Sequence, residues 1–167
     1  RLDSVDFALT DKSLIPMGFG ASNSVAGAGA WAYVSGRILS PAPNLVRVVN
    51  RDAVVFATGL ESSFRVSDAR GLAFSSDGKR MFIAGRYPET LLIVSIMADG
   101  QNAPGLSLVR GVALPDGPNE VRTIPRQGRG DLVAVTCTSP GSVALYDDDV
   151  GDLVTVVSAV GIQPFGL

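Results

Sequence analysis

The sequence predicts an all-β protein built from repeated four-stranded antiparallel units, and the first observation behind this is a period near fifty residues. The segment "YVSGR" begins at Tyr33, "FIAGR" begins at Phe82, 49 residues later, and "LVA" begins at Leu132, 50 residues further on. The run that precedes each of these also recurs, as "RGLAF" from Arg70, "NEVRTI" from Asn119 and "FGL" at 165–167. A period of this length made of short strands indicates a propeller or a solenoid.

The second observation is that each repeat contains four strand-length segments separated by turn residues. In the middle repeat, "SSDGK", "RYPE" and "ADGQNAPG" are rich in Gly, Pro, Asp and Asn, which favour turns, and they divide four apolar segments. The expected strands are 71–74, 81–84, 90–96 and 107–114 in this repeat; 120–125, 132–137, 142–147 and 153–160 in the next; and 21–26, 30–35, 45–49 and 53–58 in the first. The runs "LLIVSI" at 91–96 and "LVTVV" at 153–157 are nearly continuously apolar, as expected for strands that are covered on both faces by neighbouring sheets. The fold class is therefore a β-propeller.

The repeat sets the domain organisation. We expect residues 1–18 to hold the outer strand of a preceding blade and a connector, then blades at 19–68, 69–118 and 119–163, and the entry to a following blade at 164–167, all in one domain. Closed propellers have about four to eight blades, so about three blades and an N-terminal strand predict part of a ring. The remaining partners are then further blades of a longer chain or a second copy of this chain.

Two stretches resemble a known repeat family. "GLAFSSDGKRMFIAGR", at 71–86, and "GIQPFGL", at 161–167, look like the YVTN-type β-propeller repeat, which is also found in lactonase-like propellers and is related to WD40-like repeats. "RQGRGD" replaces "SSDGKR" in the third repeat, and the first repeat lacks the Asp, so those two blades depend on spacing. The count of about three blades predicts that the chain is part of a six- or seven-bladed ring. The resemblance favours a periplasmic or extracellular protein, although the single cysteine fits the cytoplasm equally well.

Composition excludes several function classes. The chain has 14 basic and 16 acidic residues without charge runs, so nucleic acid is not expected as a partner, and no apolar stretch is long enough to span a membrane. The sequence contains no histidine, which removes Ser-His-Asp and Cys-His catalysis from this chain. Cys137, in the apolar context "LVAVTCT", is expected to be a buried strand residue.

The candidate ligand-binding residues lie where loops meet at one face of the predicted propeller. Arg37 and Arg86 occupy equivalent repeat positions, so they could contribute to a ring of guanidinium groups suited to carboxylate or phosphate. The alternative is that these arginines form salt bridges between blades, with acids such as Glu61, Asp68 or Glu89. The full candidate set is Arg37, Arg70, Arg86, Tyr87, Asn119 and Glu120.

One acidic cluster, "DDDVGD" at 147–152, offers a weak calcium candidate in Asp147, Asp149 and Asp152. It lacks the spacing of a calcium loop and falls where a hairpin must turn, so a solvated turn is the preferred interpretation.

We expect no cofactor. The predicted function is a non-catalytic binding or scaffold domain that presents loops to a protein, glycan or small ligand; the alternative is part of a lactonase-like hydrolase whose catalytic residues lie on other blades.

Overall fold

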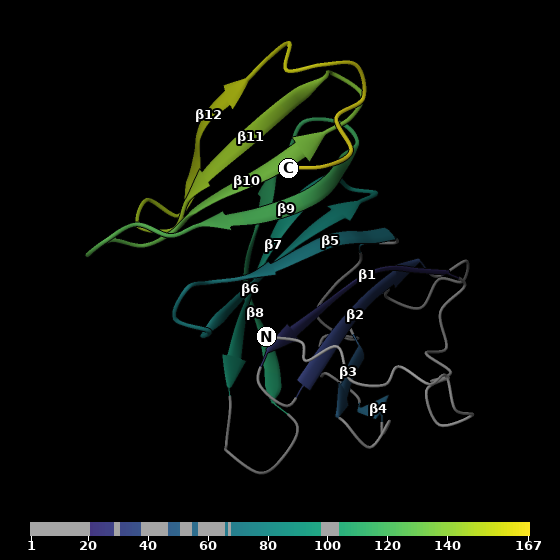
Figure 1. Cartoon of the computed structure of the whole chain (residues 1–167), viewed down its shortest axis with the longest axis vertical. Helices are drawn as coiled ribbons and strands as arrows, with labels where there is room; N and C mark the ends of the chain where they lie inside the picture. Colours follow the sequence, from purple (N-terminus) through teal and green to yellow (C-terminus); the bar gives the residue numbers. More distant parts are fainter. Residues whose placement is uncertain are drawn as a thin grey trace, which may run out of the picture.

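The computed structural model describes residues 21–28, 31–37, 47–50, 55–56, 66, 68–97 and 104–167. The regular structure of these residues consists of β-strands (Figure 1). The first group is β1 (Ala21–Ala28), β2 (Trp31–Arg37), β3 (Arg47–Asn50) and β4 (Val55–Phe56). The second is β5 (Asp68–Phe74), β6 (Arg80–Arg86), β7 (Thr90–Met97) and β8 (Gly105–Ala113). The third is β9 (Pro118–Ile124), β10 (Leu132–Cys137), β11 (Ser142–Asp147) and β12 (Asp152–Val157).

Each group is an antiparallel meander in which consecutive strands pair. β9 to β12 form a separate four-stranded sheet, whereas the first two groups are joined through the pair Arg37 and Asp68, which links β2 to β5. The predicted all-β class and its antiparallel four-stranded sheets are confirmed, and the strand ends differ from those expected by at most three residues. The closed ring, its blade number and the limits of the blades stay predictions, and the strand expected within residues 1–18 lies outside the described residues.

Tight turns explain why the strands begin and end where they do. Between β5 and β6, Gly78 has a φ of 71° and donates its N–H to the Ser75 carbonyl at 2.9 Å. Between β11 and β12, Gly151 has a φ of 78° and donates to the Asp147 carbonyl at 2.7 Å. Glycine adopts such a φ without a steric penalty, so these positions reverse the chain within a few residues.

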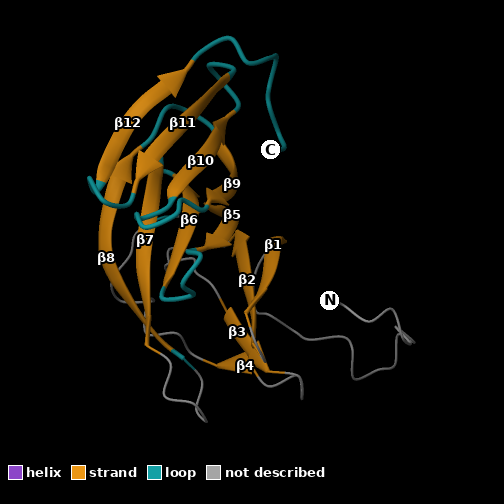
Figure 2. Ribbon diagram, turned by 60° about the vertical axis from the view of Figure 1, so that its left-hand side comes forward, coloured by secondary structure: helices purple, strands orange, loops and turns teal. Residues whose placement is uncertain are grey.

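The sheet of β5 to β8 lies between the other two groups (Figure 2), and its central strands β6 and β7 are buried on both faces, whereas β8 is largely exposed. Its alternating side chains contribute to two separate core clusters, because successive residues of a strand point to opposite faces. Met81 and Ile83 pack with Tyr33 of β2, whereas Phe82 and Ala84 pack with residues of β9 to β11. The predicted covering of both faces is confirmed for the run 91–96 in β7 and is wrong for the run 153–157, because β12 is an edge strand whose Val154 and Val156 are 48% and 42% exposed.

The first strands of the second and third groups approach each other closely. A Cβ atom at Gly71 would lie 2.6 Å from the Asn119 carbonyl oxygen and 2.8 Å from the Val121 nitrogen, so β5 and β9 are in backbone contact there. The Thr123 hydroxyl donates a hydrogen bond of 2.7 Å to the Phe74 carbonyl between the same two strands. The sheets are thus stacked face to face with their first strands adjacent.

No helix in the described parts of the chain has the length and apolar character needed to cross a bilayer.

Candidate functional site

Strand pairing divides the candidate residues between two ends of the sheets. Asp68 pairs with Arg86 and Pro118 pairs with Cys137, which places the starts of β5 and β9 at one end, here called the entry end. Phe74 pairs with Met81 and Leu132 with Ile124 at the other end, here called the turn end, which carries the β5–β6, β9–β10 and β11–β12 turns. The predicted ligand-binding residues lie at or near the entry end.

Arg86, the last residue of β6, connects two sheets at the entry end. Its Nε donates to the Pro118 carbonyl at 2.8 Å, and its Nη2 is 3.4 Å from the Gly117 carbonyl oxygen. The alternative interpretation expected a contact between blades through an acidic side chain, but these two contacts use backbone carbonyls instead. The guanidinium is therefore held in one position by the start of the next sheet.

Arg70 is held by an acid of its own strand. Its Nη2 lies 2.7 Å from Asp68 Oδ2, and its Nε donates to the same oxygen at 3.0 Å. Asp68 is 2% exposed, so this pair is part of the packed sheet. The Arg37 backbone is opposite Asp68 and Ala21 in the sheet, but its side chain lies outside what the structure describes, as does Glu61.

The remaining candidates differ in how much surface they present. Tyr87 is 61% exposed and adopts a φ of 61° in the turn after β6. Asn119 donates from Nδ2 to the Phe165 carbonyl at 2.9 Å, which ties the C-terminal tail to the start of β9. Glu120 forms an ion pair of 2.9 Å with Arg122 two residues along the same strand. The structure thus brings Arg86, Tyr87 and Asn119 to the entry end, with Tyr87 the most exposed of the three.

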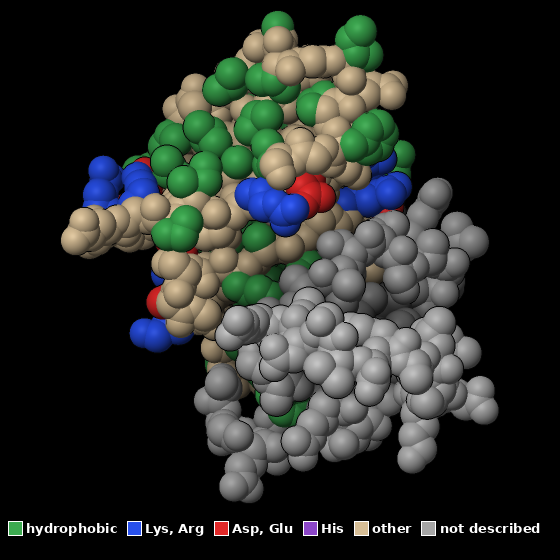
Figure 3. All heavy atoms as spheres, in the orientation of Figure 1, with side chains coloured by type: hydrophobic (Ala, Val, Ile, Leu, Met, Phe, Trp, Pro, Cys, Tyr) green, Lys and Arg blue, Asp and Glu red, His purple; other side chains and the backbone are tan. Residues whose placement is uncertain are grey.

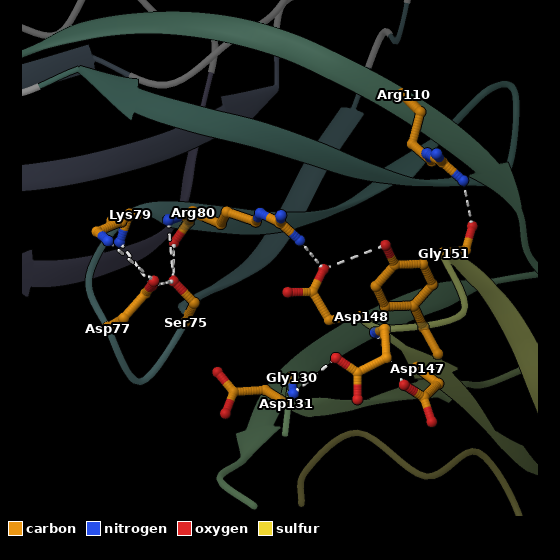
Figure 4. A network of polar contacts seen from close by, with 12 residues as sticks. Ser75, Asp77, Lys79, Arg80, Arg110, Gly130, Asp131, Asp147, Asp148 and Gly151 are labelled. Carbon is orange, nitrogen blue, oxygen red and sulfur yellow. Dashed lines mark hydrogen bonds and ion pairs between the residues drawn. The ribbon is translucent and has the colours of Figure 1, made fainter. Parts of the chain in front are cut away.

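Sequence reasoning missed a polar cavity of about 150 Å³ at the turn end, between the second and third sheets. Buried Asp131 accepts the Ser76 N–H at 2.6 Å and the Ser76 hydroxyl at 2.8 Å (Figure 4 shows Asp131 beside the turn). Arg80 forms an ion pair with Asp148. The lining residues are Ser75, Ser76, Asp77, Arg80, Arg129, Gly130, Asp131 and Asp148.

The cavity residues bind one another rather than forming a catalytic pair. The Ser75 hydroxyl donates to Asp77 Oδ1 at 2.6 Å, and this hydrogen bond is the main reason that the pKa of Asp77 lies below its usual value. Tyr146 donates its hydroxyl to Asp148 at 3.3 Å, and burial raises the Tyr146 pKa to about 12. A carboxylate with a lowered pKa is a weak general base, so Asp77 is poorly suited to abstract a proton. The contacts of Ser76 with Asp131 and of Arg80 with Asp148 instead form a latch between the turns of the two sheets.

Arginine binds two of the carboxylates that were candidate calcium ligands. Arg126 donates from Nη1 and Nη2 to the two oxygens of Asp147 at 2.9 and 2.7 Å, and its Nη2 also lies 3.3 Å from Asp149 Oδ2. The bidentate bond lowers the Asp147 pKa to about 2. Asp152 accepts the N–H of the neighbouring Leu153 at 2.8 Å. Among the described residues, no group of three or more His, Cys, Asp or Glu side chains is placed to hold a metal ion.

Cys137 has the predicted structural role. It is fully buried, and burial raises the pKa of its thiol to about 11. A thiol so rarely ionised at neutral pH is a poor nucleophile.

Searches with the sequence found no matching protein-family model and no matching curated protein. Comparison of the structure gives a fold class, the lactonase-like β-fold. A similar solved structure is that of a Bacteroides fragilis protein provisionally named 6-phosphogluconolactonase, with a TM-score of 0.62 and 16% sequence identity. The match covers 87% of this chain and 40% of that chain, so this chain spans well under half the length of its structural neighbour. This likeness agrees with the lactonase-like part of the predicted resemblance; the YVTN-type repeat stays a prediction.

Proposed function

We propose that this chain is a binding sector of a lactonase-like β-propeller and that it presents the entry end to a small anionic ligand without carrying the catalytic groups. The stacked four-stranded sheets and the fold likeness support the propeller part of the proposal. The sequence has no histidine, which supports binding over acid–base catalysis by this chain. Placement in the periplasm or outside the cell stays a prediction.

The observation that carries the binding role is the exposed Tyr87 beside a fixed guanidinium. Arg86 is held by the Pro118 carbonyl at 2.8 Å, so the residue next to Tyr87 is anchored to the following sheet. An aromatic ring on a rigid turn loses little conformational entropy when a ligand packs on it. The Arg86 guanidinium supplies positive charge close to the same turn.

The fold neighbour favours a second candidate function, a sugar-lactone hydrolase. That protein is named for the lactone of a phosphorylated sugar acid, and this chain matches 40% of it. In this second candidate the catalytic residues belong to blades other than those described here, and the chain contributes part of the ring.

The test uses Tyr87→Gly, because glycine accepts a φ of 61° and the variant removes the exposed ring. We expect 6-phosphogluconate to shift the amide resonances of Tyr87, Arg86 and Gly117 of the full chain saturably in NMR titrations. The variant should bind at least about tenfold more weakly, which corresponds to about 1.4 kcal/mol of binding free energy. Val150→Ala, an exposed position at the turn end, is the control and should bind as the parent chain does.

A parallel assay separates the two candidate functions. The chain should not accelerate hydrolysis of 6-phosphogluconolactone above its spontaneous rate. Acceleration by the parent chain would favour the hydrolase and contradict the non-catalytic role, whereas absence of both binding and hydrolysis would refute the proposed small anionic ligand.

A further inference from the structure

The polar cavity at the turn end lies where turns of two different sheets meet. The β5–β6 region contributes Ser75 and Arg80, the β9–β10 turn contributes Asp131, and the β11–β12 turn contributes Asp148. Figure 3 shows positive and negative side chains close together at the left of the view, where these turns lie. The cavity volume of about 150 Å³ is enough for about five water molecules at ~30 Å³ each, so a ligand that replaces this water must be small.

Arg80 has hydrogen-bond donors that the protein does not use. Its Nη1 donates to Asp148, and its backbone N–H donates to the Ser75 hydroxyl oxygen at 2.9 Å. Within the described parts of the chain, neither Nε nor Nη2 of Arg80 forms a hydrogen bond. These two nitrogens form one edge of the planar guanidinium, and such an edge binds a carboxylate through two parallel hydrogen bonds.

Asp148 and Asp131 are neighbours that supply acceptors to the same cavity. Leu132 pairs with Asp147, and the Asp148 N–H donates to the Asp131 carbonyl at 3.0 Å, so the two acids lie opposite each other one position beyond this pair. Side chains opposite each other in antiparallel strands lie on the same face. Two carboxylates therefore meet at this place, and Arg80 binds only one of them.

Both carboxylates keep accepting capacity. The Asp148 side chain is 11% exposed, and its Oδ1 accepts from Arg80 and from the Tyr146 hydroxyl (Figure 4), whereas Oδ2 has no partner in the described part of the chain. Each oxygen of Asp131 accepts one hydrogen bond from Ser76. Since a carboxylate can accept about four hydrogen bonds, both acids can still bind an ammonium group.

The charges around the cavity favour a ligand that carries both signs. The lining holds the carboxylates of Asp77, Asp131 and Asp148 and the guanidinium groups of Arg80 and Arg129. A simple anion next to Arg80 would meet the carboxylates, and a simple cation next to Asp148 would meet a guanidinium, and like charges repel each other strongly where water is partly excluded. An ammonium and a carboxylate on one small molecule avoid both repulsions.

We propose that the turn-end cavity is a binding site for a small α-amino acid in its zwitterionic form. The ligand carboxylate binds the Nε–Nη2 edge of Arg80, and the ligand ammonium binds Asp148 Oδ2 and Asp131. The alternating charges of Arg80, Asp148, ammonium and carboxylate then form a closed set. The hydrogen bonds between the turns already hold these side chains in place, so binding orders few groups.

The proposal goes beyond the anionic ligand of the entry end and does not depend on it. The test titrates glycine into the full chain and follows the amide resonances by NMR. We expect saturable shifts for Ser76 and Gly130, which line the cavity, and none for Arg86 and Tyr87 at the entry end. Glycinamide lacks the carboxylate and N-acetylglycine lacks the ammonium, so each should bind at least about tenfold more weakly than glycine.

A matched pair of variants tests the residues. Asp148→Asn keeps an oxygen for Arg80 and Tyr146 but removes the negative charge that attracts the ammonium, and it should bind glycine at least about tenfold more weakly. Asp116→Asn makes the same change of charge at an exposed position between β8 and β9, and it should bind glycine as the parent chain does. If Asp148→Asn does not fold, the three ligands on the parent chain still decide the proposal.

Three results would overturn the proposal. The first is absence of saturable shifts of Ser76 and Gly130 up to about 100 mM glycine. The second is binding of glycinamide or of N-acetylglycine as tight as that of glycine, which would identify a site for a cation or for an anion alone. The third is parental affinity in folded Asp148→Asn. Since none of these results involves 6-phosphogluconate or Tyr87, the two proposals fail separately.

Discussion

At the scale of single residues, Gly71 shows most directly how the sheets approach each other. In Gly71→Ala the new methyl group would lie 2.6 Å from the Asn119 carbonyl oxygen and 2.8 Å from the Val121 nitrogen. Both are backbone atoms, which cannot move away as easily as the end of a flexible side chain. We expect a loss of about 1 to 3 kcal/mol in the free energy of unfolding, measured by urea denaturation. Gly166→Ala is the control, because a Cβ there meets nothing within 4 Å, and an equal loss in both variants would contradict the close approach.

Asp147 should make stability depend on pH. Its folded pKa of about 2 lies below the ordinary value of 3.8 because Arg126 hydrogen-bonds the charged form. A lowered folded pKa stabilises the native state above the unfolded pKa and loses this effect as the pH falls through the folded pKa. We therefore expect the melting temperature of Asp147→Asn to lie below that of the parent chain at pH 7. The difference in melting temperature should disappear between about pH 4 and pH 2.

Thermal melts of both proteins across this pH range provide the measurement. Asp152→Asn, whose carboxylate accepts the N–H of its neighbour Leu153, serves as the control variant in the same melts. A difference in melting temperature between Asp147→Asn and the parent that stays constant down to pH 2 would show that the bond between Asp147 and Arg126 does not control acid stability.

At the scale of elements, the turn between β5 and β6 depends on the neighbouring sheet. Buried Asp131 accepts two hydrogen bonds from Ser76, so Asp131→Ala should loosen this turn at a cost of about 1 to 2 kcal/mol. Hydrogen exchange should accelerate at 75–79 and leave the entry end unchanged. Asp116→Ala, an exposed residue between β8 and β9, is the comparison, and equal acceleration in both variants would argue against the latch.

At the scale of the whole molecule, the middle sheet links two cores. Ile83 and Leu92 belong to the core shared with β2, whereas Phe82 and Leu91 belong to the core shared with β9 to β11. The middle sheet is therefore stabilised by the layers packed on its faces as well as by its own strand pairing, as in repeat proteins whose units contact their neighbours.

The sequence by itself determined the strands, the turns and their period, because these depend on local signals: apolar alternation, and glycine at positions such as Gly78 where φ is positive. It also predicted correctly that Cys137 is buried and that the run 91–96 in β7 is covered on both faces, but the same prediction for 153–157 was wrong, because β12 lies at the edge of its sheet. The tertiary structure alone decided the partners of the charged residues, since Ser76 and Asp131 lie 55 residues apart and Arg80 and Asp148 lie 68 apart. Such contacts follow from how two sheets are stacked, and no local pattern encodes that geometry. For the same reason the structure, and not the sequence, showed that carbonyls hold Arg86 and that Arg126 binds Asp147 and Asp149, two of the three carboxylates considered for calcium.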